Sequence, residues 1–265
     1  MRRWILLSLG ALLIVGCLAP AASAQFSINC KRSHSLMDDP IVFGGSPGAS
    51  HLHEFFGNRS TNAFSTYATM VASTSTCRFS KDTAGYWAPA MLIDGTVVEP
   101  VSINAYYRPP NQFVDPKAVV AFPPDFRMVA GGDTIAAPSV AYWSCDDQAV
   151  TRTPLPGACP LNKTVHANVS FPSCWDGESL DAFDHRSHVA YPAVDGGCPD
   201  THPIMVPRVT VIVRYGIRDA TGAMLSSGLP TSLHADFWNT WQQDALVAQV
   251  DRCIHVKRNC VGLRG

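Results

Sequence analysis

The sequence predicts a mostly β fold, β-sandwich or jelly-roll-like, with long loops, disulfides and a C-terminal helix. Three observations predict it. Several short segments alternate apolar with polar residues, as a strand with one buried face does. The 20 prolines and 19 glycines are spread along the chain, which suits a loop-rich domain better than a helical bundle. Eight cysteines follow the first 24 residues, and such an even number in an exported chain indicates a disulfide framework.

Residues 1–24 are expected to be a signal peptide. Two arginines precede an apolar run over residues 4–15, and Ala22-Ser23-Ala24 is a small-residue cleavage pattern. The apolar run is shorter than the roughly 20 residues that a membrane-spanning helix needs. Cys17 closes a sequence that also resembles a lipoprotein processing box, but cleavage after Ala24 is favoured. We therefore expect a secreted or periplasmic protein without a transmembrane segment, with residues 25–265 as a single domain.

The charge balance indicates which partners to expect. Lys and Arg total 20 and Asp and Glu total 21, for a net charge of −1, and the predicted leader removes two further positive charges. A nucleic-acid-binding domain would favour a strongly basic face, so no nucleic acid is expected as a partner.

Strand patterns dominate the middle of the chain. Tyr86–Ile93 and Val97–Tyr107 are joined by Asp94-Gly95, which supplies the positive φ angles of a tight turn, and together they predict a β-hairpin. Four further segments are expected to be short strands: Ala118–Phe122, Ser139–Trp143, Thr164–Phe171 and Arg208–Tyr215.

One helix is predicted near the C-terminus, over Asp236–Cys253. The segment has no Gly or Pro, and its apolar residues Phe237, Trp241 and Ala245 recur at helical spacing. Asp236 would lie at the positive end of the helix dipole.

The cysteines after residue 24 are Cys30, Cys77, Cys145, Cys159, Cys174, Cys198, Cys253 and Cys260. Eight cysteines allow 105 pairings. Proximity in the sequence favours Cys145–Cys159, Cys174–Cys198 and Cys253–Cys260, which leaves Cys30–Cys77. Zinc ligation by these cysteines is disfavoured because no CxxC pair is present.

Candidate catalytic residues fall into three clusters of His and Asp. The first is His51-Leu52-His53, where an extended backbone would place both imidazoles on one face, as metal ligation or proton transfer requires. The second contains Asp184, His185 and His188, so that a carboxylate can fix the tautomer of a nearby imidazole. The third is His234-Ala235-Asp236, at the expected entry to the helix.

Other residues extend this list. A divalent metal is a candidate cofactor, with His51, His53 and His188 as its ligands, and Trp175, Asp176 and His202 are candidate substrate-binding residues. Asp38, Asp39, Asp184 and Asp236 are candidate acids for glycoside cleavage, which needs two carboxyls at a defined separation. The alternative for each cluster is a buried histidine that hydrogen-bonds to a carboxylate and only stabilises the fold.

Several motifs resemble a known family. The segments DDPIVFGGSPGASHLHEFFGN, FPSCWDG, LDAFDHRSHVAYP, CPDTHPI and HADFWNTW are similar to the domain-of-unknown-function family numbered nineteen-ninety-six, over about residues 38–241. Its members are typically secreted bacterial and fungal proteins, some joined to carbohydrate-binding modules. The resemblance puts these residues on its motif positions: His51, His53, Asp184, His185, His188, His202, His234 and Asp236. It implies no particular reaction.

Two classes of function remain open. One is a glycan-cleaving enzyme, hydrolase or lyase, that acts on an extracellular polysaccharide through a metal or through His/Asp acid–base catalysis. The other is a non-catalytic glycan-binding or structural surface domain, in which aromatic residues bind sugars or the histidines serve only folding.

Overall fold

The computed structural model describes residues 24–132, 140–147 and 152–265. The predicted signal peptide up to Ser23, the alternative lipidation site at Cys17 and the first residue of the predicted strand Ser139–Trp143 therefore lie outside the described residues.

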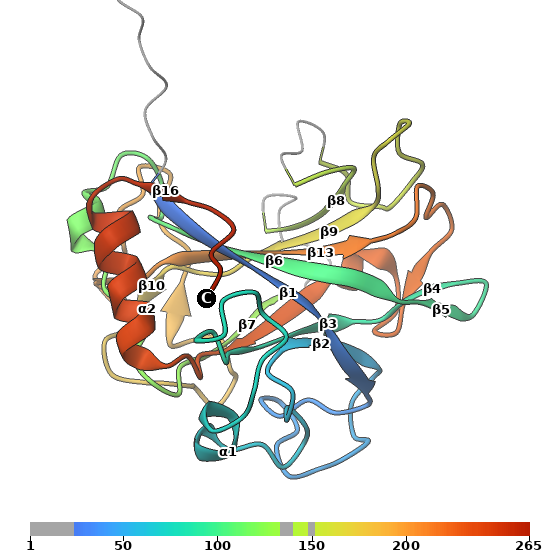
Figure 1. Ribbon diagram of the computed structural model, residues 1–265, viewed down its shortest axis with the longest axis horizontal. Coiled ribbons are helices and arrows are strands. Elements are labelled where there is room, and N and C mark those ends of the chain that lie inside the picture. Colours follow the sequence, from blue (N-terminus) through green and yellow to red (C-terminus); the bar gives the residue numbers. More distant parts are fainter. Residues whose placement is uncertain (1–23, 133–139, 148–151) are drawn as a thin grey trace, which may run out of the picture.

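Most strands of the described chain form one ten-stranded sheet (Figure 1). Its order is β7 (Arg127–Gly131), β15 (His234–Trp238), β3 (Gly85–Pro89), β2 (His53–Gly57), β1 (Gln25–Leu36), β6 (Pro100–Arg108), β13 (Arg208–Tyr215), β9 (His166–Ser170) and β8 (Ala141–Ser144). β16 (Asn259–Cys260) pairs with the start of β1 and makes the one parallel pair among these strands.

The long strand β1 joins two halves of this sheet. Its first part, Phe26–Lys31, pairs with β6, and its second part, Arg32–Leu36, pairs with β2 after a shift of register. We call β2, β3, β15 and β7 the β2 half, and β6, β13, β9 and β8 the β6 half. β1 crosses between the two halves in Figure 1.

The main hydrophobic core lies between the two halves. Alternate residues of β13, among them Val209 and Val211, point into it, and Tyr86 and Phe237 come from the β2 half. The rings of Tyr107 and Phe237 are 6.4 Å apart across the two halves. The β2 half has a second, smaller core, formed by Ile41, Phe55, Met70, Trp87, Val129 and Trp238. Both faces of the β2 half are therefore packed, and the mostly β prediction is confirmed.

Short elements surround this sheet. Two small sheets combine β4 (Met91–Ile93), β5 (Thr96–Val98) and β14 (Met224–Leu225), and β10 (Cys174–Trp175), β11 (Val189–Ala190) and β12 (Ile204–Met205). The helical segments are α1 (Tyr67–Val71), α2 (Gln243–Gln249), a π-helical stretch (Val250–His255) and 3-10 turns at Pro116–Ala118 and Pro230–Ser232.

The Asp94-Gly95 turn is confirmed, because both residues have positive φ and connect β4 to β5. The flanking strands are shorter than expected: each predicted segment divides into two, so that β3 and β6 join the large sheet instead. The prediction for Arg208–Tyr215 is confirmed over its whole length.

One predicted strand was wrong, and the predicted C-terminal helix is confirmed with a later start. Ala118–Phe122 is not a strand, because it follows the 3-10 turn and only Val120 makes a backbone bond to a neighbouring element, to Met205. The C-terminal helix begins at Gln243, not Asp236. Residues 234–238 are drawn into β15 because they pair with β3 on one side and β7 on the other, while Ala235 and Phe237 enter the main core. This tertiary pairing overrides the helical spacing.

The four disulfides are Cys30–Cys77, Cys145–Cys159, Cys174–Cys198 and Cys253–Cys260. This is the pairing that proximity favours, and it is consistent with an extracellular protein. Within the described ranges, no helix is long and apolar enough to cross a membrane.

Candidate functional site

Three histidines meet at one end of the β2 half. His53 begins β2 and His234 begins β15, with β3 between them. His53 pairs with Pro89, and the register of β15 with β3, continued by two pairs, brings His234 level with the same proline. His51 precedes β2 on the loop. The ring centroids are 4.2 Å apart for His51 and His53, 5.0 Å for His51 and His234, and 5.6 Å for His53 and His234.

Hydrogen bonds to the backbone fix the tautomers of two of these rings. Nδ1 of His53 donates to the carbonyl oxygen of Asp38 at 2.9 Å, and Nδ1 of His234 donates to that of Ser232 at 2.9 Å. A carbonyl can only accept, so both Nδ1 atoms carry hydrogen. Burial lowers the pKa of His53 well below its usual range and that of His234 to about 4, so both rings are neutral at pH 7.

Two nitrogen lone pairs consequently face one another. Nε2 of His53 lies 3.3 Å from Nε2 of His234, with no hydrogen left to bridge them in the neutral rings. Nε2 of His51 is buried and also lacks a hydrogen-bond partner among the described residues. Tetrahedral zinc with Zn–N bonds of about 2.0–2.1 Å would separate two nitrogens by about 3.3 Å. The spacing of the two rings therefore fits a shared metal ion.

Two carboxyl groups lie behind the histidines. Candidate ligand atoms of Asp39, His53 and Asp236 all fall within 4.8 Å of one another, as do those of His51, His53 and His234. Oδ1 of Asp39 accepts the N–H groups of Ile41 and Val42, each at 3.0 Å. We refer to His51, His53, His234, Asp39 and Asp236 together as the histidine site.

Asp236 is the more unusual carboxyl. It is fully buried, and neither of its oxygens has a hydrogen-bond partner in the described part of the chain. Burial, and secondarily the charge of Asp39, raise the pKa of Asp236 well above its usual range, and burial also raises the pKa of Asp39. A buried carboxylate is stable only when paired or bound to a cation, so a divalent ion would satisfy this group.

An arginine flanks the site. Nη2 of Arg186 donates to the carbonyl oxygen of Gly131 at 3.0 Å, and Gly131 pairs with His234 across β7 and β15. A Cβ at Gly132 would lie 3.5 Å from Cβ of His234 and 3.6 Å from Nη2 of Arg186. The charge of Arg186 contributes to lowering the pKa values of both His234 and Asp236. A positive charge thus lies next to the histidines.

The second predicted cluster does not join the site. Nε2 of His188 donates to the carbonyl oxygen of Arg127 at 2.7 Å, and the buried ring packs against Phe126. The third histidine beside His51 and His53 is therefore His234, and the expected ligand set with His188 needs this correction. Nδ1 of His185 is bound to Asp181 at 3.0 Å.

Asp184 stabilises its own loop and does not contact the histidines in the described structure. Its exposed carboxylate accepts the N–H groups of Ser187 and Arg186, at 2.8 and 3.0 Å, and these bonds lower its pKa to about 2. The bonds shape the turn that carries Arg186.

The candidate substrate-binding residues also have local partners. Nε1 of Trp175 donates to the carbonyl oxygen of Ser179 at 2.7 Å, and Oδ1 of Asp176 accepts the N–H of the same residue at 2.9 Å. Nε2 of His202 donates to the carbonyl oxygen of Ser187 at 2.9 Å. These three side chains shape loops, and none is among the residues grouped around the histidines.

Asp39 and Arg186 are the residues that the sequence identified least well. In the sequence, Asp39 is one of four candidate acids with nothing to distinguish it, and Arg186, between Asp184 and His188, is not among the predicted site residues. The signal for Arg186 was its place inside a His/Asp cluster, which indicated that the loop approaches a site but not which side chain does so.

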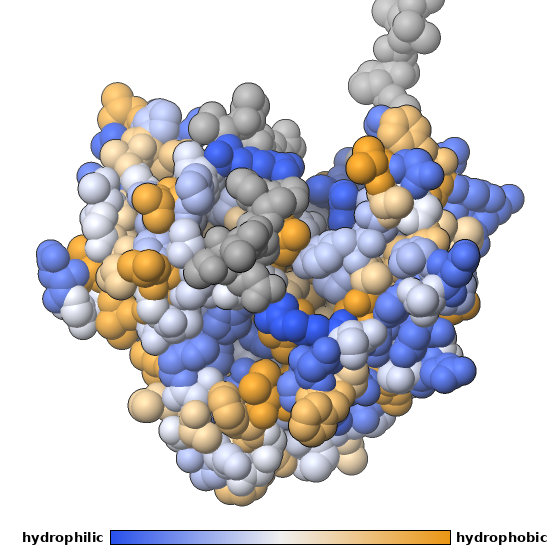
Figure 2. Space-filling model, turned by 180° about the vertical axis from the view of Figure 1, so that it is seen from behind, coloured by the Kyte–Doolittle hydropathy of each residue, from blue (hydrophilic) through white to orange (hydrophobic). Residues whose placement is uncertain are grey.

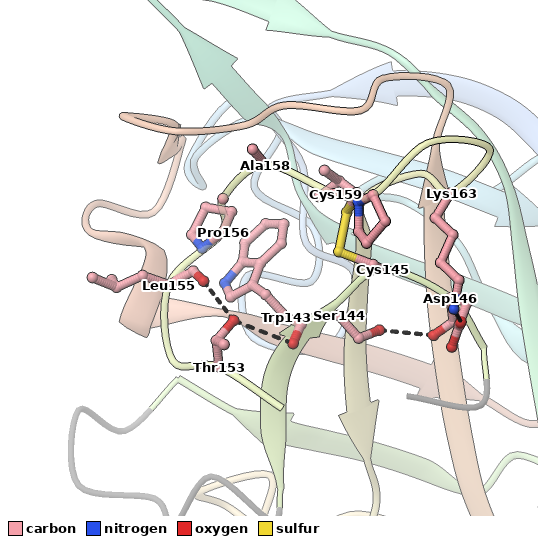
Figure 3. Close-up of a pocket in the computed structure, with 13 residues that line it drawn as sticks. Trp143, Ser144, Cys145, Asp146, Thr153, Leu155, Pro156, Ala158, Cys159 and Lys163 are labelled. Carbon is pink, nitrogen blue, oxygen red and sulfur yellow. Dashed lines mark hydrogen bonds and ion pairs between the residues drawn. A yellow bond between two sulfur atoms is a disulfide. The ribbon is translucent and has the colours of Figure 1, made fainter. Parts of the chain in front are cut away.

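A pocket of about 370 Å³ lies elsewhere, beside the Cys145–Cys159 disulfide (Figure 3). Its polar groups interact with one another: Lys163 and Asp146 form an ion pair at 2.5 Å, and the hydroxyl of Thr153 donates to the carbonyl oxygen of Leu155 at 2.7 Å. It offers no group of metal ligands among its described residues, so the histidine site is the stronger candidate.

Comparison with known proteins gives one match. Residues 39–241 match a protein family described as a domain of unknown function, DUF1996, and the matched segment contains every residue of the histidine site and Arg186. No curated protein and no solved structure matches the chain. Because the match covers most of the 265 residues, the chain belongs to the DUF1996 family of domains of unknown function.

Proposed function

We propose that this protein is an exported, metal-dependent enzyme that acts on an extracellular or cell-wall glycan. The observation that carries the proposal is the 3.3 Å contact between two Nε2 atoms, those of His53 and His234, whose hydrogens are both on Nδ1. Two facing lone pairs repel, and a cation between them turns the contact into coordination. Neutral imidazoles suit a first-row transition ion such as zinc.

The ligand arrangement supports catalysis rather than a purely structural metal site. Structural zinc sites are closed by four protein ligands, whereas catalytic sites have three and keep a position open. His51, His53 and His234 would provide the three nitrogens, which leaves the fourth position of a tetrahedral ion for water or substrate. The bound ion would polarise a substrate oxygen or lower the pKa of a water molecule.

The remaining groups have defined roles in this proposal. Asp236 lies behind His53 without a hydrogen-bond partner of its own, so it can balance the charge of the ion and accept or return a proton. Arg186 lies on the other side of His234 and would stabilise negative charge that develops on a substrate oxygen. Asp39 is held by two backbone N–H groups and would orient the ligands.

Export and a glycan substrate are parts of the same proposal. The predicted signal peptide and the four disulfides favour an oxidising compartment, where polysaccharides are common substrates. On the face in Figure 2, hydrophobic residues are scattered among hydrophilic ones and the surface is hollowed, which suits a polar ligand. The chemistry would be hydrolysis or elimination at a glycosidic bond.

Metal analysis tests the first part. The chain from residue 25, purified without a His-tag and loaded with zinc, is expected to retain about one ion after dialysis. His53→Ala and His234→Ala should each lose the ion. His255→Ala should retain it, because His255 is not part of the histidine site and bonds to Val119 and Asp251 instead. Equal metal content in all four proteins would contradict the site.

Activity tests the second part. Metal-loaded protein is incubated with plant and cell-wall glycans, and released products are compared with those from chelator-treated protein and from His234→Ala. Products that need both the metal and His234 would support the enzyme. Stoichiometric metal without product from any glycan would contradict the catalytic part and leave a metal-binding domain.

A further inference from the structure

Two arginines lie directly opposite each other at the end of the β6 half. Arg108 of β6 pairs with Arg208 of β13, so their side chains leave the same face of the sheet. Like charges in directly opposite positions destabilise an antiparallel pair. Arg152 adds a third charge that lowers the pKa of Arg208, after burial and Arg108. The fold therefore concentrates positive charge at this position.

No acid of the described residues neutralises this pair. Neither arginine forms an ion pair among residues 24–132, 140–147 and 152–265. Nε of Arg108 donates to the neutral Oε1 of Gln25 at 2.6 Å. Nε of Arg208 is buried with no hydrogen-bond partner in the described chain. A buried donor on a charged group is costly to leave unsatisfied, so an anion bound here would stabilise the arrangement.

The arginines line an open pocket of about 530 Å³. Lys257 adds a further cation to its wall, and Phe113, Gln112 and Val194 form part of the remainder, with no carboxylate among the lining residues. Phe113 is 74% exposed, and Val194 is fully exposed. Phe113 is the aromatic residue of this lining, whereas Tyr106 lies under Arg108, with its ring centroid 4.6 Å from the guanidinium.

These groups together describe one kind of ligand. Guanidinium groups bind carboxylate and sulfate oxygens with paired, charge-assisted hydrogen bonds. An exposed aromatic face attracts the positively polarised C–H groups of a sugar ring, because the ring face is negative. A saccharide that carries a carboxylate beside a C–H face would engage both.

We propose that the pocket formed by Arg108, Arg208, Lys257 and Phe113 binds an acidic polysaccharide, with a sugar carboxylate on the paired arginines and the ring on Phe113. None of these residues belongs to the histidine site, so this inference stands without the proposed enzyme activity.

Calorimetric titration of the chain from residue 25 with oligogalacturonate tests the proposal. Arg208→Gln and Arg108→Gln are each expected to weaken binding at least tenfold. Arg59→Gln, which removes the same charge from an exposed loop position, should change the affinity less than twofold. Phe113→Ala should weaken binding of the oligomer but not of free galacturonate. Higher salt should weaken every charge-dependent interaction.

Thermal unfolding of each variant shows whether a loss of binding comes from a loss of folded protein. Arg208→Gln relieves repulsion, so its Tm should equal or exceed that of the wild type. Three outcomes would overturn the proposal: no binding of oligogalacturonate, equal binding of a neutral cello-oligosaccharide, or the same loss of affinity in Arg59→Gln. Binding of inorganic sulfate as tight as that of the oligomer would limit the pocket to small oxyanions and overturn the polysaccharide assignment.

Discussion

Nε2 of His53 lies 3.3 Å from Nε2 of His234, although 181 residues separate them in the chain. The contact depends on three neighbouring strands of one sheet and on two backbone carbonyls that hold the hydrogens on Nδ1. The metal ion proposed above would turn this repulsive contact into coordination and would stabilise the fold.

Zinc should raise the thermal stability of the protein. An ion at a hundredfold excess over its Kd contributes about 2.7 kcal/mol to the folded state, which corresponds to roughly 5–10 °C in Tm for a chain of this size. Scanning calorimetry of the chelated and zinc-loaded protein measures the shift. His234→Ala should show no shift, whereas His255→Ala should behave as the wild type. A shift retained in His234→Ala would place the ion elsewhere.

Asp236→Asn should change stability in opposite directions with and without metal. In the chelated protein, replacing a fully buried carboxyl without partners by an amide should raise the Tm, because an amide cannot ionise and no charge can be left buried. In the zinc-loaded protein, the variant should gain less from the ion than the wild type. Asp200→Asn, an exposed position, should leave both Tm values unchanged. A lower Tm for Asp236→Asn in both states would argue against charge balance by this carboxyl.

Gly131→Ala should disrupt the site by a backbone collision. Gly131 has positive φ, and an added Cβ would lie 2.4 Å from the carbonyl oxygen of Leu233 and 3.0 Å from Cα of His234. We expect a loss of about 2–4 kcal/mol in unfolding free energy and weaker zinc binding. Gly95→Ala isolates the cost of positive φ alone, since nothing lies within 4 Å of its Cβ, and should cost about 1 kcal/mol. Equal losses in urea denaturation would refute the collision.

Asp147 should stabilise the fold above pH 4 and lose this effect in acid. Burial alone would raise its pKa, but bonds from His166, Arg214 and Asn104 outweigh burial and lower the pKa to about 2. Arg214 binds both carboxylate oxygens, at 2.9 and 2.8 Å. The contribution is present above the unfolded pKa of 3.8 and is lost as the pH falls toward 2.

Asp147→Asn measures this contribution. It should cost about 2 kcal/mol in urea denaturation at pH 6 and less than half as much at pH 2.5, because a pKa shift of one unit corresponds to about 1.4 kcal/mol. The exposed variant Asp251→Asn should show no such pH dependence. A loss that is the same at both pH values would indicate a packing effect.

Asp82 should have the opposite pH dependence. Burial raises its pKa to about 8, while its carboxyl bonds to the hydroxyl of Tyr86 at 2.9 Å. Between the unfolded pKa and pH 8, unfolding releases a proton, so stability falls as the pH rises. Asp82→Asn cannot ionise, and its amide oxygen can accept the hydrogen bond that the hydroxyl of Tyr86 donates to the carboxyl. Its stability relative to the wild type should increase by more than about 1 kcal/mol from pH 5 to pH 8. A constant difference in chemical denaturation would refute an ionisable buried Asp82.

Local patterns in the sequence were sufficient for several parts of the fold. The Asp-Gly turn, the strand Arg208–Tyr215 and three of the four disulfides depend on segments close in the chain, and the structure agrees with each. Cys30–Cys77 then follows as the remaining pair. The sequence also predicted one part of the candidate site. His51 and His53 lie side by side, as expected for two residues that share one face of an extended backbone.

Tertiary structure decided the rest, because it depends on strands that are distant in sequence. Helical spacing predicted that Asp236 begins a helix, but pairing with β3 and β7 makes residues 234–238 a strand and buries the carboxyl. The same pairing selects His234 over His188 as the partner of His53. Periodicity reports the local backbone preference, whereas the choice of partners across a sheet is set by packing of its two faces, and only the folded chain reveals it.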